Sequence, residues 1–517
     1  MMSLLAWAMV SVVPSLAQDD GAARLTDDVS YRAEAQVSIS DGTTPLWLNA
    51  NKYGLSSMEE ANGYLRAAVE RPLQADSARR WAIGYGVDVA VPFHYTSKFV
   101  VQQAFADVRW LQGVLTVGSK EQPLELKNAL LSTGSQTLGI NARPVPMVRL
   151  SLPDYWEVPF AHGWLALKGH FAYGMTTDDA WQKDFTHQQK RYTEKALLHT
   201  KAGYLRIGRT DRRLTLELGL EMACQFGGTM YAVNNNPALT MEGEKGISGM
   251  IKAFVPGGTD ATDADYHNAS GNHLGSYVAR VNYDADSWRL SVYGDHFFED
   301  HSSMFMLDYD GYGTGDEWDV RKDNRYFLYD LKDMMLGAEL NLKGGSWVRD
   351  IVVEYLYTKY QSGPVYHDHT PNMSNHISGR DDYYNHNLYT GWQHWGMVMG
   401  NPLYRSPLYN RDGRIEVTNN RFVAWHLGVA GRPLAGLDYR LLATWQRGYG
   451  TYNMLFDDPE TSVSLLAEAT YRFADTSKLA GWAVKASVGM DRGDIYGDNT
   501  GAQLTVVKTG FLNKKRK

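Results

Sequence analysis

The sequence predicts an all-β protein: a transmembrane outer-membrane β-barrel of about 18 antiparallel strands, occluded by long external loops. Three observations predict it. Apolar and polar residues alternate with a period of two in many runs, short and long connections follow one another along the chain, and no apolar stretch approaches the 18 residues of a membrane helix.

The alternation is clear in residues 214–222, where leucines fall on one side and Thr215, Glu217 and Glu221 on the other. Residues 482–490 repeat the pattern with Trp and Val. In a membrane barrel the apolar face of such a strand meets lipid and the polar face lines the lumen. The predicted strands are residues 31–40, 62–71, 80–91, 98–110, 112–119, 145–151, 162–175, 196–208, 213–226, 274–284, 287–298, 334–343, 348–360, 420–431, 436–449, 462–474, 481–491 and 503–512.

The connections between these strands predict which end of the barrel faces outward. Short ones occur at 111–112, 209–212, 284–287, 344–347 and 431–436, and long ones at 41–61, 120–144, 176–195, 227–273, 299–333, 361–419 and 492–502. Because the two kinds alternate, all the long loops lie at one end. Outer-membrane barrels have long extracellular loops and short periplasmic turns.

The composition is consistent with this class and excludes others. The net charge is -7, so no basic excess indicates nucleic-acid binding. The chain contains 32 Tyr and 15 Trp, which suits the aromatic girdles of a barrel. Cys224 is the single cysteine, so the chain has no internal disulfide and no multi-thiolate metal site.

The ends of the chain are expected to lie outside the barrel. Residues 1–17 predict a signal peptide, with a short apolar core and small residues before Gln18. Residues 18–512 form the barrel with its extracellular loops, notably 227–273, 299–333 and 361–419, and residues 513–517 form a basic C-terminal tail.

The strand faces predicted to line the lumen carry many charges. We expect these side chains to pair with one another, because unpaired charges in a narrow lumen are unfavourable. They are Asp88, Lys168, Glu217, Glu221, Arg289, Asp295, Glu354, Arg440, Lys485 and Asp491.

Two histidine-rich stretches could bind a divalent metal or act in acid-base catalysis. One is His296 to His301, with Glu299 and Asp300, and the other is the pair His367 and His369, which His386 or His394 could complete. The alternative, which we favour, is that they are hydrogen-bonded or solvated loop residues, so we expect no bound metal and no cofactor.

Residues 360–403 combine rings with amides, carboxylates and histidines without the apolar period of a core strand. Sugars stack their CH faces on indole and phenol rings, and their hydroxyls bond amide, carboxylate and guanidinium groups. This segment therefore predicts either saccharide contact or a plug that closes the lumen. The candidate polysaccharide-binding residues are Tyr366, Asp368, Arg380, Asp381, Tyr383, Tyr384, His386, Trp392, Gln393 and Trp395.

Nine stretches in collinear order resemble the Wzi-type capsule assembly family, in the form found in Bacteroides-like bacteria. They are WLNANKYGLSS from Trp47, FVVQQAFADVRW from Phe99, TVGSKE from Thr116, NARPVPMVRLSLPDY from Asn141, GWLALKGHFAYGMTTDDAWQKDF from Gly163, HFFEDHSSMF from His296, QSGPVYHDHT from Gln361, YTGWQHWGMVMGNPL from Tyr389 and DRGDIYGDNTG from Asp491.

The resemblance implies an occluded barrel that anchors capsular polysaccharide at the cell surface like a lectin, without catalysis. Expected partners are capsular polysaccharide, outer-membrane lipid and lipopolysaccharide, with no nucleic acid, and the protein is expected to be a monomer. Enteric members carry a small periplasmic helical bundle, for which partial helices at 56–61 and 121–131 are the candidates here. Two other function classes stay open, a hydrolase acting on glycan or lipid and a diffusion porin.

Overall fold

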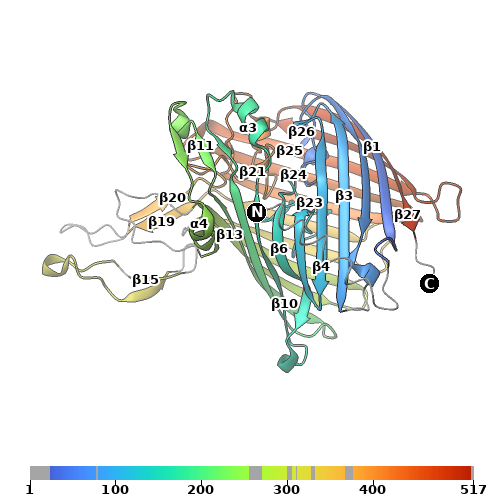
Figure 1. Ribbon diagram of the computed structural model, residues 1–517, viewed down its shortest axis with the longest axis horizontal. Helices are drawn as coiled ribbons and strands as arrows, with labels where there is room; N and C mark the ends of the chain where they lie inside the picture. The colour runs from blue at the N-terminus through green and yellow to red at the C-terminus, as the bar shows by residue number, and fades with distance from the viewer. Residues whose placement is uncertain are drawn as a thin grey trace.

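The computed structural model describes residues 24–76, 80–255, 271–299, 306–309, 311–327, 332–366 and 377–513. They form one 18-stranded sheet whose strands pair antiparallel with their neighbours along the chain (Figure 1). The first barrel strand pairs with both the second and the last, so the sheet closes into a barrel and the predicted fold is confirmed.

The barrel strands are β1 (Val29–Asp41), β2 (Ala61–Arg71), β3 (Trp81–Phe93), β4 (Val100–Trp110), β5 (Gly113–Ser119), β6 (Met147–Glu157), β7 (Leu165–Met175), β9 (Leu197–Ile207), β10 (Leu214–Phe226), β13 (Asn272–Asp284), β14 (Trp288–Glu299), β17 (Met334–Leu342), β18 (Asp350–Tyr357), β23 (Phe422–Leu434), β24 (Leu437–Gly450), β25 (Leu455–Arg472), β26 (Trp482–Gly493) and β27 (Asn499–Asn513). The loops contain α2 (Leu46–Asn49), α3 (Asp179–Thr186), α4 (Gly246–Phe254), β8 (Tyr192–Glu194), β11 (Thr229–Tyr231), β12 (Thr240–Glu242), β15 (Met306–Tyr309), β16 (Asn324–Phe327), β19 (Ser362–Tyr366), β20 (Ile377–Arg380), β21 (Gln393–His394) and β22 (Met397–Val398).

The outside of the barrel is apolar and the inside is polar. Between β2 and β3, Leu65 pairs with Val91 and Val69 with Val87, and all four side chains are exposed on the outer face. Arg66, one residue after Leu65, is buried on the inner face. Hydrocarbon on the outside and charge on the inside is the pattern of a barrel whose outer surface meets lipid. No helix among the described residues is long and apolar enough to cross a bilayer.

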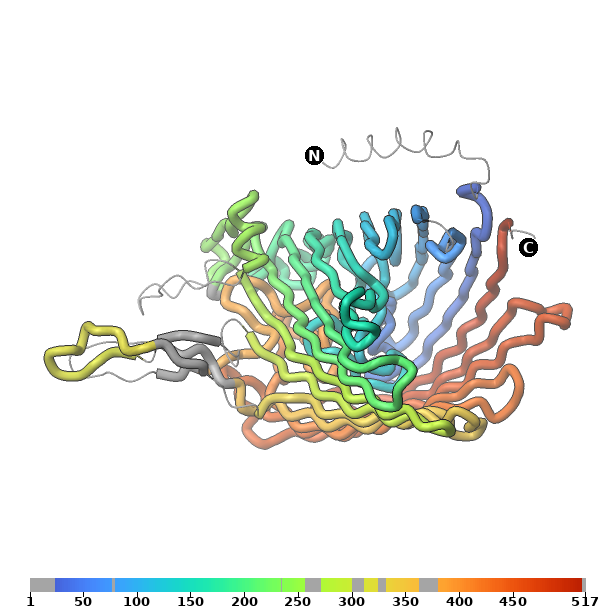
Figure 2. The backbone as a smooth tube through the Cα atoms, turned by 90° about the horizontal axis from the view of Figure 1, so that it is seen from below, coloured from blue at the N-terminus to red at the C-terminus, as the bar shows by residue number. Residues whose placement is uncertain are grey.

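All the long connections lie at the end of the barrel where β1 ends and β2 begins. The hairpin of β15 and β16, drawn in yellow, reaches out beyond the barrel wall (Figure 2). Three connections at this end are short, residues 94–99, 451–454 and 494–498, so the predicted alternation of lengths holds only in part.

The largest difference in strand bounds is at β25, which begins at Leu455 rather than at 462. Its early residues include Asp457, Asp458 and Pro459, which are uncommon inside strands, so the sequence pattern breaks off there. The pairing of Gly450 with Leu455 extends the strand beyond that pattern.

The partial helices expected at 56–61 and 121–131 are absent, and the prediction was wrong. In the second segment two backbone carbonyls accept hydrogen bonds from side chains of the barrel wall. Leu126 O accepts from Arg280 (2.9 Å) and Leu131 O accepts from His426 (2.7 Å). These bonds from the wall satisfy carbonyl groups that a helix would otherwise pair internally.

Candidate functional site

The lumen of the barrel is filled by parts of three of its own loops, residues 42–60, 120–146 and 381–421, which we call the plug. The largest hydrophobic cluster of the described residues lies there, inside the barrel. It joins Trp47 of the first loop, Leu131 of the second and Trp392 of the third to inward-facing residues of the wall. Apolar packing between loops therefore supplies a core that the barrel wall alone lacks.

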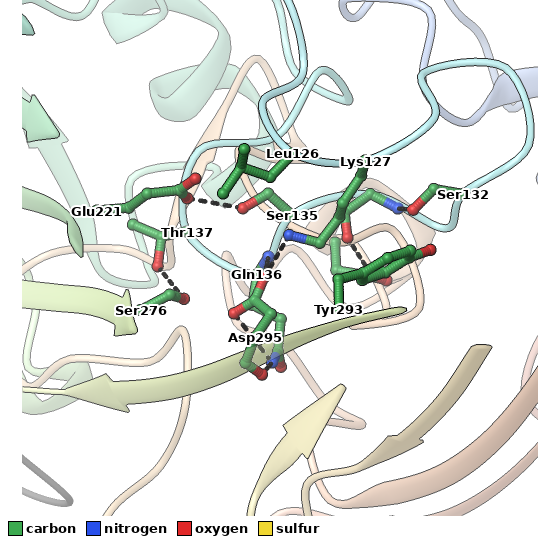
Figure 3. Close-up of polar contacts among 12 residues, drawn as sticks. Leu126, Lys127, Ser132, Ser135, Gln136, Thr137, Glu221, Ser276, Tyr293 and Asp295 are labelled. Carbon is green, nitrogen blue, oxygen red and sulfur yellow. Dashed lines mark hydrogen bonds and ion pairs between the residues drawn. The ribbon is translucent and has the colours of Figure 1, made fainter. Parts of the chain in front are cut away.

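Carboxylates on the wall hold residues 126–137 of the plug in place (Figure 3). Glu354 of β18 accepts bonds from the Thr133 backbone N–H (2.8 Å), the Thr133 hydroxyl (2.7 Å), the Ser132 hydroxyl and the Tyr293 hydroxyl (2.6 Å). Such a carboxylate is stabilised by charge-assisted bonds, and its removal leaves several buried donors without an acceptor.

Two further carboxylates act in the same way, Glu221 on β10 and Asp295 on β14. Glu221 accepts from Ser135 (2.8 Å), and Asp295 accepts from the Gln136 backbone N–H (3.2 Å) and pairs with Lys127 (2.9 Å). Burial opposes the charge of Lys127, but Asp295 and Glu221 raise its pKa above the ordinary value. The plug segment is thus bound to the wall by charge as well as by packing.

This arrangement corrects the expectation that the lumenal charges pair mainly with one another. Arg440 does pair with another wall residue, Glu468 (2.8 Å). Glu221, Asp295 and Glu354 instead bind the plug. They accept hydrogen bonds from backbone N–H and hydroxyl groups of residues 132–137. The polar sequence of residues 132–137, STGSQT, was the signal that sequence reasoning missed.

The third loop packs on the second. The Trp392 indole N–H donates to Thr137 O (3.0 Å), and the Tyr404 hydroxyl donates to Gln136 Oε1 (3.0 Å). The rings of Tyr384 and Tyr404 stack 4.1 Å apart. Residues 381–421 and 126–137 therefore form one packed body within the lumen.

The predicted site residues divide into buried and exposed groups. Tyr383, Tyr384, Trp392 and Gln393 are at most 1% exposed and lie within the plug, closed to a ligand from outside. The burial of these four side chains is what we expect of a segment that closes the lumen. His386 is partly buried, while Tyr366 is placed only by its backbone in β19 and Asp368 lies outside the described residues.

Arg380, Asp381 and Trp395 keep exposed surface. Trp395 is half-buried, and the Arg143 guanidinium lies 4.2 Å from its ring centroid. The Trp395 backbone N–H and the Gln393 amide both donate to Asp178 Oδ2 (3.1 Å each). These two bonds fix the third loop to the start of α3. Burial lowers the pKa of Arg143 to about 10, although the nearby Asp178 acts to raise it.

Trp395 belongs to an aromatic surface at the loop end of the barrel that sequence analysis did not predict. Trp181 and Phe185 stack 4.9 Å apart in α3, and Tyr192 and Tyr231 stack 4.8 Å apart. These rings and Trp395 belong to one cluster drawn from three loops. The spacing of Trp181 and Phe185 by four residues, one helical turn, was the available signal. We call this cluster the outer aromatic surface.

The histidine stretches offer no shared metal site within the part of the chain that the structure describes, where no group of three or more His, Cys, Asp or Glu could hold an ion. His296 bonds the carbonyl of Asp333 (2.7 Å), and Glu299 accepts from the Tyr384 backbone (2.6 Å). Asp300, His301, His367 and His369 lie outside the described residues.

His386 and His394 act as hydrogen-bond acceptors in the third loop. His386 Nδ1 accepts from the backbone of Leu388 (3.1 Å), and His394 Nε2 accepts from the backbone of Thr177 (3.1 Å). Both bonds need the neutral ring. Burial lowers the pKa of His386 to about 3 and lowers the pKa of His394 as well.

Acidification should therefore loosen residues 381–421. The unfolded loop takes up protons below its ordinary histidine pKa of about 6.5 while the docked loop does not, so docking is strongest above that pH and weakens below it. The free energy of docking should fall by at most about 1.4 kcal/mol per pH unit per histidine.

The measurement is the rate of loop proteolysis at pH 7.5 and pH 5, normalised to an unfolded substrate. His187→Asn, an exposed loop position, should keep the pH dependence, whereas His386→Gln with His394→Gln should flatten it. Equal wild-type rates at both pH values would contradict the idea.

Comparison with known proteins identifies one matching family and similar solved structures. The family described as capsule assembly protein Wzi matches residues 32–317, more than half of the chain. The fold is similar to the solved Wzi of Escherichia coli, described as a carbohydrate-binding β-barrel of the outer membrane involved in group 1 capsule assembly, with 13% identity, a TM-score of 0.55, and 95% of this chain and 85% of that chain covered. OprD of Pseudomonas aeruginosa matches with 10% identity and a TM-score of 0.44, over 93% of this chain and 94% of that chain. No curated protein sequence matches this chain.

Proposed function

Because this chain belongs to the Wzi capsule assembly protein family, we propose that it lies in the outer membrane and anchors capsular polysaccharide at the cell surface. The apolar outer face of the barrel supports the location. We further propose that it represents the Bacteroides-like form of the family and acts as a monomer, with its long loops extracellular.

The observation that carries the proposal is the combination of a filled lumen with an aromatic and cationic surface above it. An 18-stranded barrel without a plug leaves an aqueous channel. Here the plug fills that space with an apolar core and buried hydrogen bonds, which disfavours the diffusion porin. A polysaccharide that binds at the loop end does not need to pass through the lumen.

The outer aromatic surface is the proposed sugar contact. Trp395, Phe185 and Tyr231 are each partly exposed, and the Arg143 guanidinium lies against Trp395. Rings of this kind stack on sugar CH faces. Of the residues predicted from sequence, Arg380, Asp381 and Trp395 remain candidates for direct contact, and the buried Tyr383, Tyr384, Trp392 and Gln393 hold the loop that presents them.

The test is binding of purified capsular polysaccharide from the protein's own strain to the detergent-solubilised protein. Trp395→Ala combined with Phe185→Ala should weaken binding about tenfold, since a stacked aromatic contact contributes up to about 1.5 kcal/mol. Trp347→Ala is the matched control, because Trp347 is 71% exposed in a turn at the opposite end of the barrel. The proposal fails if wild-type protein retains no polysaccharide or if the double variant binds as the control does.

A further inference from the structure

A group of basic side chains lies on the outer face of the barrel at the end that carries the loops. Lys359 follows β18, Arg421 precedes β23 and Arg447 lies in β24. In these strands Phe422 and Ala424 are buried toward the lumen, so Arg421 shares the outward face with the exposed Trp425. We call Lys359, Arg421 and Arg447 the basic rim.

The strand register gives the height of the basic rim on the barrel. Tyr355, Trp425 and Trp445 pair side by side across the three strands and form an outward aromatic row. Arg447 is the next outward residue after Trp445, and Arg421 lies two outward positions beyond Trp425. Each outward position is about 7 Å further along a strand.

An aromatic row marks the boundary between hydrocarbon and headgroups in membrane barrels. The cations therefore lie at the level of the lipid headgroups, at the end from which the long loops leave. They face sideways toward neighbouring lipid, whereas the outer aromatic surface belongs to the loops themselves.

Among the residues that the structure describes, the basic rim contacts aromatic rings rather than carboxylates. Lys359 Nζ lies 3.9 Å from the ring centroid of Tyr449, and the Arg421 guanidinium lies 3.8 Å from that of Tyr452. Arg380 also approaches Tyr452, at 5.4 Å. Cation–π contacts orient a cation without neutralising its charge.

Elsewhere in the barrel, cations are commonly matched by acids, as Arg66 is by Asp88 and Lys127 by Asp295. Among the described residues the basic rim forms no ion pair. The adjoining β25 carries Asp457 and Asp458 near its start, both exposed, and neither forms an ion pair with another described residue. Clustered like charges at a membrane boundary are stabilised by an anionic partner.

We propose that the basic rim binds the phosphate groups of a phosphorylated glycolipid in the outer leaflet, the lipid A portion of lipopolysaccharide. Guanidinium groups bond phosphate oxygens in pairs, and a lysine adds a point charge. The apolar wall below the rim accepts the acyl chains. The inference rests on the outer-membrane location but not on polysaccharide binding, so the two can fail separately.

The test is titration of the detergent-solubilised full-length protein with bisphosphorylated lipid A, followed by native mass spectrometry. The triple variant Lys359→Gln, Arg421→Gln, Arg447→Gln should bind this lipid about tenfold more weakly, because charge-assisted bonds to phosphate are lost. Wild-type binding should also weaken as salt is raised. Lipid A with both phosphates removed should bind equally weakly to both proteins.

The matched control removes three exposed cations from the opposite end of the barrel, by Arg212→Gln, Arg213→Gln and Arg289→Gln. It should bind bisphosphorylated lipid A as the wild type does. The proposal is overturned if the rim variant also binds normally, or if dephosphorylated lipid binds wild type as tightly. It is likewise overturned if the rim variant loses capsular polysaccharide but keeps the lipid, which would assign the cluster to the polysaccharide.

Discussion

Replacing residues 127–137 with a glycine-serine linker of equal length should turn a closed barrel into a conducting one. The wild type should pass little current in a planar bilayer, and the variant should conduct about tenfold more, since barrels of this size enclose an aqueous channel when unplugged. The replacement removes Lys127 and the donors that bind Glu221, Asp295 and Glu354, while the barrel wall keeps every strand.

A single substitution tests the attachment of residues 127–137 to the barrel wall. Glu354→Ala leaves the Thr133 N–H and the Tyr293 hydroxyl without their acceptor, at about 1–3 kcal/mol for each buried donor. Opening events should become more frequent in the same recording. Glu157→Ala is the control, because Glu157 is exposed at the other end and its contact with Arg206 is long (3.5 Å). A wild type that already conducts freely would contradict the role of the plug.

Trp392→Ala should undock the third loop from the second. Trp392 is 1% exposed, belongs to the cluster inside the barrel and borders a cavity of about 140 Å³ beside β6 and β7. Truncating a buried Trp costs about 3–5 kcal/mol. The loss should appear as a faster proteolysis of residues 381–421, with the barrel itself still resistant.

Trp392→Phe separates packing from hydrogen bonding. It keeps most of the apolar area but leaves Thr137 O without the indole donor, so the expected loss is about 1–3 kcal/mol. An equal effect of the two substitutions would mean that the indole bond, and not the packing, docks the loop. No effect of Trp392→Ala would refute a structural role for the third loop.

Much of the fold follows from local sequence. The period of two in residues 214–222 is a property of neighbouring residues, and it predicted β10 correctly. Where turn and strand residues mix, as at Asp457 to Pro459, the local pattern fails because pairing with β24 decides the structure. The candidate binding residues were chosen by residue type, because rings and amides gather in 360–403, and the sequence did not give their exposure.

The sequence by itself determined an 18-stranded barrel with its long loops at one end, because strand faces and connection lengths are local quantities. Only the tertiary structure decided that Trp392 is buried while Trp395 reaches the surface, and that Glu354 holds a loop more than 200 residues away in the chain. The physical reason is that burial in the lumen depends on which loops fold inward together. That choice is set by long-range packing and by wall carboxylates that meet their donors only after the barrel has closed.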